Sequence, residues 1–231
     1  MTSSFRTLVL AAVAVACNNT PAEPSPSQRP AGAAAADEGA LAEPSAKLLA
    51  PKDANEQAPE TFKVKFVTTK GDFVVEAHRD WSPNGVDRLY NLVKIGFFTD
   101  IAFFRAVEGF MVQFGIHGHP QVAKAWQNAN IQDEPVKEGN KRARLTFAKT
   151  ALPNTRSTQM FINYKDNTNL DKMGFSAVGE VVEGMSVVDS LNKEYGEAPS
   201  AKQGEITRSG NPYLRKTFPN LDYIKSAELL K

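Results

Sequence analysis

The sequence predicts a mainly β domain in which many short strands and two helices form a closed antiparallel barrel. Short segments after residue 61 alternate between apolar and polar residues with a period of two, which is typical of half-buried strands. Two segments, 82–96 and 185–192, have the spacing of helices. Many short strands with few helices favour a barrel, because closure leaves no exposed sheet edge.

The first half of the domain is expected to contain two strands, a helix and a hairpin. Residues 62–66 alternate phenylalanine or valine with lysine, and residues 73–78 return as a second strand after a turn. A helix is expected over 82–96, because a serine and a proline begin it and a glycine ends it. Residues 103–115, FFRAVEGFMVQFG, predict a hairpin that turns at Gly109.

The second half is expected to alternate loops with further strands. The polar segment 116–144 is predicted to be a loop. Strands are predicted at Leu145–Thr150, Thr158–Tyr164 and Phe175–Val182. A short helix (Met185–Asn192) and a long loop with several glycines and a proline precede a last apolar segment, Leu221–Leu229.

Composition argues against several kinds of function. The net charge of +1 gives no electrostatic footprint for nucleic acid, so no nucleic-acid partner is expected. The single cysteine, Cys17, excludes an internal disulfide and a cysteine-based metal site. His117 and His119 could suggest a metal, but further ligands are missing from the pattern, so we interpret them as part of a solvated loop. Asp133–Glu134 is interpreted as a solvated acidic turn. We therefore expect neither a metal nor a cofactor.

The first sixteen residues have the pattern of a secretory signal peptide. Arg6 precedes an apolar run, Leu8–Ala16, that is shorter than the roughly 20 residues of a transmembrane helix. The run leads into Ala14-Val15-Ala16-Cys17, which resembles a bacterial lipobox, although Ala14 stands where leucine is usual. The favoured interpretation is a lipidated Cys17. The alternative is an ordinary secretory signal with small residues around its cleavage site.

The following residues are expected to form a flexible tether. Residues 18–60 are rich in proline, alanine, serine and glutamate and lack a periodic apolar face, so burial cannot offset chain entropy. A helix through 41–50 would have little to pack on. The predicted organisation is a signal peptide (1–16), a lipidated cysteine with its tether (17–60) and a folded domain (61–231). Such a protein would be exported and anchored on the periplasmic side of a bacterial cell envelope, and we expect a monomer.

Three motifs in the domain carry a specific combination of residues. They are 103–115, LTFAKTALPNTRSTQMFIN (145–163) and LDKMGFSAVGEVVEGMSVVD (170–189). In this order they resemble the motifs of the cyclophilins, a family of peptidyl-prolyl cis–trans isomerases. The resemblance covers roughly residues 61–231. It implies an eight-stranded antiparallel barrel capped by two helices, and an enzyme without a cofactor that acts on proline-containing polypeptides.

The chemistry of such an enzyme requires few groups. Rotation about an X–Pro bond meets a barrier of about 18–20 kcal/mol, because amide resonance is lost in the twisted state. No bond is made or cleaved, so the catalyst only has to favour the twisted amide, which a fixed cation beside an apolar proline pocket can do. The resemblance implies that Arg105 is this cation. Without the resemblance, a surface salt bridge is an equal alternative.

The resemblance also implies roles for the residues around the arginine. Gln113 and Gln159 would orient the arginine and the substrate backbone. Ala148 and Lys149 would pair with the substrate before its proline through their backbone groups. The proline pocket would consist of four apolar residues, each of which would otherwise be interpreted as plain core: Phe110, Met111, Phe161 and Leu170.

Three further substrate-binding positions depart from the family pattern. Phe104 stands where many members have a histidine beside the catalytic arginine. Asn169 stands where many eukaryotic members have the tryptophan associated with cyclosporin binding, and Phe175 aligns with another position that is often histidine. We therefore expect a pocket that is more apolar on one side and wetter on another.

Two other classes of function are compatible with these residues. A proline-peptide binding module or holdase chaperone would use the same groove with little turnover. Arg105 favours the enzyme, whereas Phe104 leaves room for the binding module. A purely structural envelope lipoprotein would not need Arg105 at all.

Overall fold

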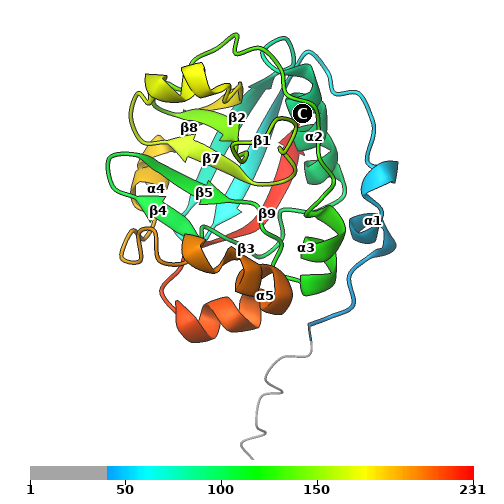
Figure 1. Cartoon of the computed structure of the whole chain (residues 1–231), viewed down its shortest axis with the longest axis vertical. Helices are drawn as coiled ribbons and strands as arrows, with labels where there is room; N and C mark the ends of the chain where they lie inside the picture. The colour runs from blue at the N-terminus through cyan, green and yellow to red at the C-terminus, as the bar shows by residue number, and fades with distance from the viewer. Residues whose placement is uncertain (1–40) are drawn as a thin grey trace, which may run out of the picture. The chain divides into compact units, whose positions relative to one another are not determined.

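The computed structural model describes residues 41–231, and its main element is one antiparallel sheet of nine strands (Figure 1). The strand order in the sheet is β3-β9-β1-β2-β8-β6-β7-β5-β4. The strands are β1 (Thr61–Thr68), β2 (Asp72–His78), β3 (Ile101–Ala102), β4 (Arg105–Val107), β5 (Met111–Phe114), β6 (Arg144–Phe147), β7 (Met160–Asn163), β8 (Ala177–Glu183) and β9 (Tyr223–Leu230). The helices are α1 (Ala46–Leu49), α2 (Pro83–Lys94), α3 (Pro120–Trp126), α4 (Met185–Asp189) and α5 (Gln203–Thr217), with short 3₁₀ helices η1 (Pro51–Asp53), η2 (Thr168–Met173) and η3 (Ser200–Lys202).

The two edge strands of this sheet are neighbours in the chain. β3 ends at Ala102 and β4 begins at Arg105, so only Phe103 and Phe104 separate the two edges. The mainly β, antiparallel architecture is confirmed. The sheet has nine strands where eight were expected, and within residues 41–231 no strand pairing joins β3 to β4. The closed barrel with two capping helices therefore stays a prediction.

The main hydrophobic core lies between the sheet and α2. Val86, Leu89 and Val93 of α2 are buried in it at the helical spacing seen in the sequence. Phe66 of β1 and Phe73 of β2 stack beside them, with ring centroids 4.9 Å apart. Fully burying one such apolar side chain contributes about 1.5–3 kcal/mol, so this core supplies the stable platform on which the rest of the domain is built.

The start of α2 is capped from a distant part of the chain. The backbone N–H groups of Asn84 and Gly85 donate to the Glu134 carboxylate at 2.7 and 3.3 Å, whereas Ser82 makes no side-chain bond to the helix backbone. Glu134 also pairs at 3.0 Å with Arg156, whose side chain is only 1% exposed. The interpretation of this acidic turn as solvated is therefore wrong, because the carboxylate is held by the positive helix start and a buried guanidinium.

A short helix occupies part of the segment 116–144, which was expected to be a loop. α3 begins at Pro120, and the side chain of His119 accepts a hydrogen bond from the backbone N–H of Gln121 at 3.3 Å. Val122 and Trp126, four residues apart, are buried. The helical spacing is present in the sequence but spans only two turns, which is too short to stand out from the polar residues around it.

The segment after residue 192 was expected to be a long loop, but it contains the helix α5. α5 contains Pro212 and is kinked at Gly210, whose φ is 61° and ψ is −150°. A side chain at Gly210 would collide with the carbonyl oxygen of Gly118, so glycine is required there. Ile206 and Leu214 are buried on either side of the kink. Residues that usually end a helix lie inside this one, which explains why the sequence pattern indicated a loop.

The residues directly before β1 pack against the domain. In this N-terminal strap (residues 45–60), the backbone carbonyl of Leu48 accepts a hydrogen bond from Trp126 Nε1 at 2.7 Å. The strap also exchanges two bonds with α2, because Asn91 accepts from the Glu56 N–H at 3.0 Å and donates to the Glu56 carbonyl at 2.7 Å. The structure thus differs from the flexible tether expected up to residue 60. The signal peptide and Cys17 lie outside the described residues.

Candidate active site

The β4–β5 hairpin brings together the polar residues of the central motif. The chain turns at Gly109, whose φ of 64° glycine adopts without steric cost. Arg105 lies directly opposite Gln113 in the antiparallel register, so the two side chains share one face of the sheet. Arg105 Nη1 donates to Gln113 Oε1 at 3.0 Å. The predicted hairpin is confirmed, and its arms are Arg105–Val107 and Met111–Phe114.

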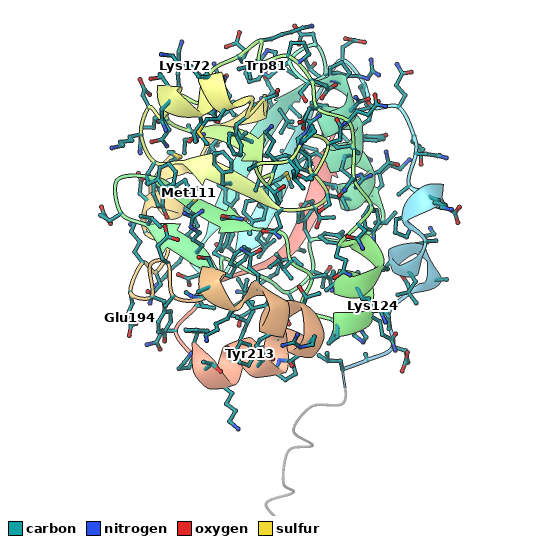
Figure 2. All side chains as sticks on the ribbon, in the orientation of Figure 1. Trp81, Met111, Lys124, Lys172, Glu194 and Tyr213 are labelled. Carbon is teal, nitrogen blue, oxygen red and sulfur yellow. The ribbon has the colours of Figure 1, made fainter. Side chains whose placement is uncertain are left out.

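The alternation of side chains along β5 directs them into two environments. Val112 and Phe114 belong to the main core, whereas Met111, labelled in Figure 2, packs with Phe161 of β7 in a separate buried cluster. Gln113 lies opposite Phe161 in the pairing of β5 with β7. We call Met111, Gln113 and Phe161 the sheet wall. Their positions follow from strand register, so a shift of one residue would turn them away from the site.

The sheet wall forms one side of a cavity of about 350 Å³. In Figure 1, β4 and β5 lie beside the orange start of α5, which contributes to the opposite side. The cavity therefore brings together nine of the twelve predicted catalytic and substrate-binding residues. Its lining consists of Arg105, Phe110, Met111, Gln113, Ala148, Lys149, Phe161, Leu170, Phe175, Glu197, Ser200 and Gln203.

The opposite side is polar and comes from the segment before and at the start of α5. We call Glu197, Ser200 and Gln203 the C-terminal wall. The Glu197 carboxylate accepts hydrogen bonds from Arg105 Nε at 2.8 Å and from Arg105 Nη2 at 2.7 Å. The hydrogen bond from the guanidinium holds the pKa of Glu197 below its usual value, and the charge of Arg105 acts in the same direction. The carboxylate therefore stays ionised at neutral pH.

A chain of three amides joins the two walls. Gln113 Nε2 donates to Gln159 Oε1 at 2.8 Å, and Gln159 Nε2 donates to Gln203 Oε1 at 3.0 Å. Since Gln113 Oε1 accepts from Arg105, each amide has one defined orientation along the chain. The guanidinium is thus held from two directions, directly by Glu197 and through the amides by Gln203.

The other three predicted residues, Phe104, Gln159 and Asn169, do not line this cavity. Phe104 is 1% exposed and belongs to a separate core cluster with Ile116 and Leu214, so it does not line the cavity. Asn169 is exposed on η2 and is not part of the lining. Gln159 lines a smaller neighbouring cavity. The expectation that Phe104 makes the pocket more apolar is therefore wrong, because its ring points into the core.

Buried asparagines that the sequence analysis did not single out support the cavity from behind. Asn167 Nδ2 donates to the carbonyl of Phe110 at 2.9 Å and to Asn163 Oδ1 at 2.8 Å. Asn140, which is fully buried, donates through Nδ2 to the carbonyl of Phe175 at 2.8 Å. These bonds fix the backbone of two residues of the lining. In the sequence, the only sign of these buried asparagines was Asn163, which ends the apolar run MFIN.

Metal ligands are not gathered in the described part of the chain. Among residues 41–231, no group of three or more His, Cys, Asp or Glu side chains could hold a metal ion. Within the same residues, every helix is too short or too polar to cross a membrane.

The sequence model of the family described as cyclophilin type peptidyl-prolyl cis-trans isomerase/CLD matches residues 63–211. This chain belongs to the cyclophilin-type peptidyl-prolyl cis–trans isomerases. The cyclophilin match includes Arg105, the sheet wall and the C-terminal wall. The predicted enzyme activity, isomerisation of peptidyl-prolyl bonds, is that of this family.

Named relatives and solved structures agree with this assignment. Peptidyl-prolyl cis-trans isomerase B of Escherichia coli (strain K12) is 32% identical over 141 residues, which cover 55% of this chain and 82% of the relative. A probable peptidyl-prolyl cis-trans isomerase of Brucella abortus (strain 2308) is 32% identical over 133 residues, covering 53% and 67%. A crystal structure of a Cryptosporidium parvum cyclophilin has a TM-score of 0.56 at 19% identity, covering 74% of this chain and 98% of that one. That structure supports the cyclophilin fold.

Proposed function

We propose that this isomerase binds an exposed X–Pro segment in the cavity and accelerates its rotation with Arg105. The observation that carries the proposal is the position of Arg105 at the edge of the buried apolar cluster of Met111, Phe161 and Leu170. Its side chain is 26% exposed, so the guanidinium is both held by the protein and reachable by a substrate. A proline ring can occupy the apolar cluster while its amide faces the cation.

The proposed catalytic effect is electrostatic. When the X–Pro amide twists, the prolyl nitrogen becomes pyramidal and basic, and it can then accept a hydrogen bond that the planar amide cannot accept. An N–H of Arg105 directed at this region stabilises the twisted state more than either planar state, which is the condition for catalysis. Because the donor is already held in place by Gln113 and Glu197, little reorganisation is needed during the rotation.

The substrate backbone before the proline is proposed to pair with Ala148 and Lys149. The Ala148 N–H already donates to the carbonyl of Gln159 at 2.9 Å, which leaves its carbonyl oxygen for the substrate. The Lys149 side chain pairs with Asp133 at 3.3 Å, so its backbone, not its charge, is proposed to make the contact. A structure of the Cryptosporidium parvum protein in the presence of the dipeptide ala-pro, with a TM-score of 0.55, supports a proline-containing ligand.

The test is exchange between the cis and trans forms of a short Ala-Pro peptide, measured by NMR with catalytic amounts of protein. Replacing Arg105 with alanine should lower kcat/KM by about 10²-fold or more, because one preorganised donor is lost. Arg208→Ala, at an exposed arginine of α5, is the control and should keep parental activity. Equal activity of Arg105→Ala and the parent would overturn the mechanism. Peptide binding without accelerated exchange by the parent would favour the proline-peptide binding module.

We further propose that the protein is exported and anchored through Cys17. The support is the sequence alone: an apolar run directly precedes the only cysteine of the chain. Envelope polypeptides with exposed X–Pro bonds would then be its substrates. Cys17→Ser should release the protein from the membrane fraction or leave its signal peptide uncut. A mature N-terminus beyond Cys17 without a lipid, detected by mass spectrometry, would contradict the anchor.

The closed barrel with two capping helices, and the monomeric state, also belong to this proposal. The two edges of the sheet are separated by only two residues, Phe103 and Phe104, which supports closure between β3 and β4. A crystal structure would test closure through backbone bonds between these strands. Light scattering in solution would test the monomer, and a stable dimer would contradict it.

A further inference from the structure

Glu197 holds the guanidinium of Arg105 along one edge. Both carboxylate oxygens are used, because Oε2 accepts from Nε at 2.8 Å and Oε1 accepts from Nη2 at 2.7 Å. The single O–H of Ser200 is shared between the Glu197 carbonyl at 2.8 Å and Oε2 at 3.2 Å, so the carboxylate itself is oriented. A two-bond pair of this kind fixes the plane of an arginine as well as its position.

The arrangement leaves two donors of Arg105 for a substrate. A guanidinium has five N–H donors. Within residues 41–231, Arg105 uses one on Gln113 and two on Glu197. One N–H on Nη1 and one on Nη2 therefore remain. The Phe110 ring also lies beside the guanidinium, with its centre 5.8 Å from Arg105 Cζ. The guanidinium is thus held along one edge by Glu197 and at Nη1 by Gln113, while the two terminal nitrogens keep a donor each.

Stability is a weak explanation for this ion pair. The Glu197 side chain is 59% exposed and that of Arg105 is 26% exposed, and exposed pairs usually contribute only about 0–1 kcal/mol. An unrestrained arginine side chain samples many rotamers, and that freedom would have to be lost in each turnover. A pair that restricts it beforehand contributes to the reaction rate even when it contributes little to folding.

We propose that Glu197 is a positioning residue of the isomerase, which holds Arg105 in the orientation that the twisted amide requires. This inference rests on the catalytic role proposed above for Arg105. The opposite arrangement is a latch, in which Glu197 competes with the substrate for the arginine and must release it before catalysis. Replacing Glu197 changes the kinetics in opposite directions in the two cases: loss of a positioning group lowers kcat, whereas loss of a latch raises kcat/KM.

Glu197→Gln tests the proposal, because it keeps the size of the side chain and removes its charge. We expect kcat/KM to fall about 3- to 10-fold, mainly through kcat, with KM changing by less than about 2-fold. The matched control is Glu194→Gln, in the same loop and labelled in Figure 2, whose carboxylate accepts from Asn220 at 3.0 Å. It should keep parental kinetics. Unchanged or increased kcat/KM in Glu197→Gln would overturn the proposal.

Two further measurements separate positioning from other roles. The ¹⁵N-detected NMR signal of the Arg105 Nε–H should shift and exchange faster with water in Glu197→Gln, because its acceptor becomes neutral. In an Arg105→Ala background, Glu197→Gln should have no additional effect, whereas an independent effect would show a direct contact with substrate and overturn the proposal. If Arg105→Ala is fully active, the proposed mechanism fails. If Arg105→Ala is inactive and Glu197→Gln is not impaired, only this inference fails.

Discussion

The sheet wall and the C-terminal wall face the same cavity but are built in different ways. Met111, Gln113 and Phe161 are at most 6% exposed and lie in strands whose backbone bonds set their register. Glu197, by contrast, has a side chain that is 59% exposed and lies in a loop, and its partner Ser200 begins a 3₁₀ helix. One wall is therefore part of a buried cluster, whereas the other consists of polar side chains joined by hydrogen bonds.

The difference indicates a division of tasks. A buried apolar surface on a sheet cannot change shape without disturbing its neighbours, which suits the binding of a rigid proline ring. Exposed hydrogen bonds contribute little to folding, so they can be adjusted to orient Arg105 without a large effect on stability. Substitutions in the sheet wall should therefore affect stability and activity together, and those in the C-terminal wall should affect activity alone.

Phe161→Ala in the sheet wall is expected to have the largest combined effect on the unfolding free energy and on kcat/KM. Phe161 is 4% exposed, and truncation of a buried phenylalanine usually costs about 3–5 kcal/mol of unfolding free energy. kcat/KM should fall at least about 10-fold, because the proline ring loses an apolar contact. Urea unfolding and peptide exchange measure the two effects. Leu152→Ala, at a leucine that is 68% exposed, should change neither. A stable but inactive Phe161→Ala would contradict the coupling of the two properties.

A change of pH should separate stability from catalysis without any substitution. His117 is 7% exposed, so its interpretation as part of a solvated loop is wrong, and burial lowers its pKa to about 4. The unfolded chain binds a proton near pH 6.5 that the folded protein does not bind until about pH 4, so the unfolding free energy should decrease as the pH falls. Between pH 7 and pH 5 the loss should be on the order of 2 kcal/mol.

Activity should not follow this decrease. Arg105 holds the pKa of Glu197 below its usual value, so the ion pair persists between pH 7 and pH 5 and kcat/KM of the folded protein should stay constant. His117→Asn should reduce the pH dependence of the unfolding free energy. Phe97→Leu, which changes the ring 5.1 Å from His117, should lower stability equally at each pH. A constant unfolding free energy in the parent would refute the buried neutral histidine.

The smallest effect is expected for Gln203→Ala, at the end of the amide chain. Gln203 accepts a hydrogen bond from Gln159 at 3.0 Å and reaches Arg105 only through two intervening amides. kcat/KM should fall about 2- to 5-fold, because a neutral hydrogen bond of this kind contributes roughly 0.5–1 kcal/mol. Thermal unfolding should be unchanged. The exposed neighbour Lys202→Ala is the control. A loss larger than that of Glu197→Gln would show that the amide chain is the main support of the arginine.

The sequence predicted the parts of the site that local patterns encode. The turn residue Gly109 predicted the hairpin in 103–115, and the observed register places Arg105 opposite Gln113. The three motifs also identified the residues of the sheet wall. Phe104 shows the limit of such patterns, because it lies between β3 and β4 and only the packing shows that its ring enters a core cluster.

By itself, then, the sequence determined the mainly β class, the hairpin around Gly109 and the family of the enzyme. Strand alternation, turn residues and motif order are local properties, so they can be recognised without knowing what packs against them. Only the tertiary structure decided that Glu197 pairs with Arg105, which lies 92 positions away in the chain. It also decided that the strap packs against Trp126. Such contacts depend on how distant segments fold together, and exposed polar side chains leave no periodic pattern that would reveal them.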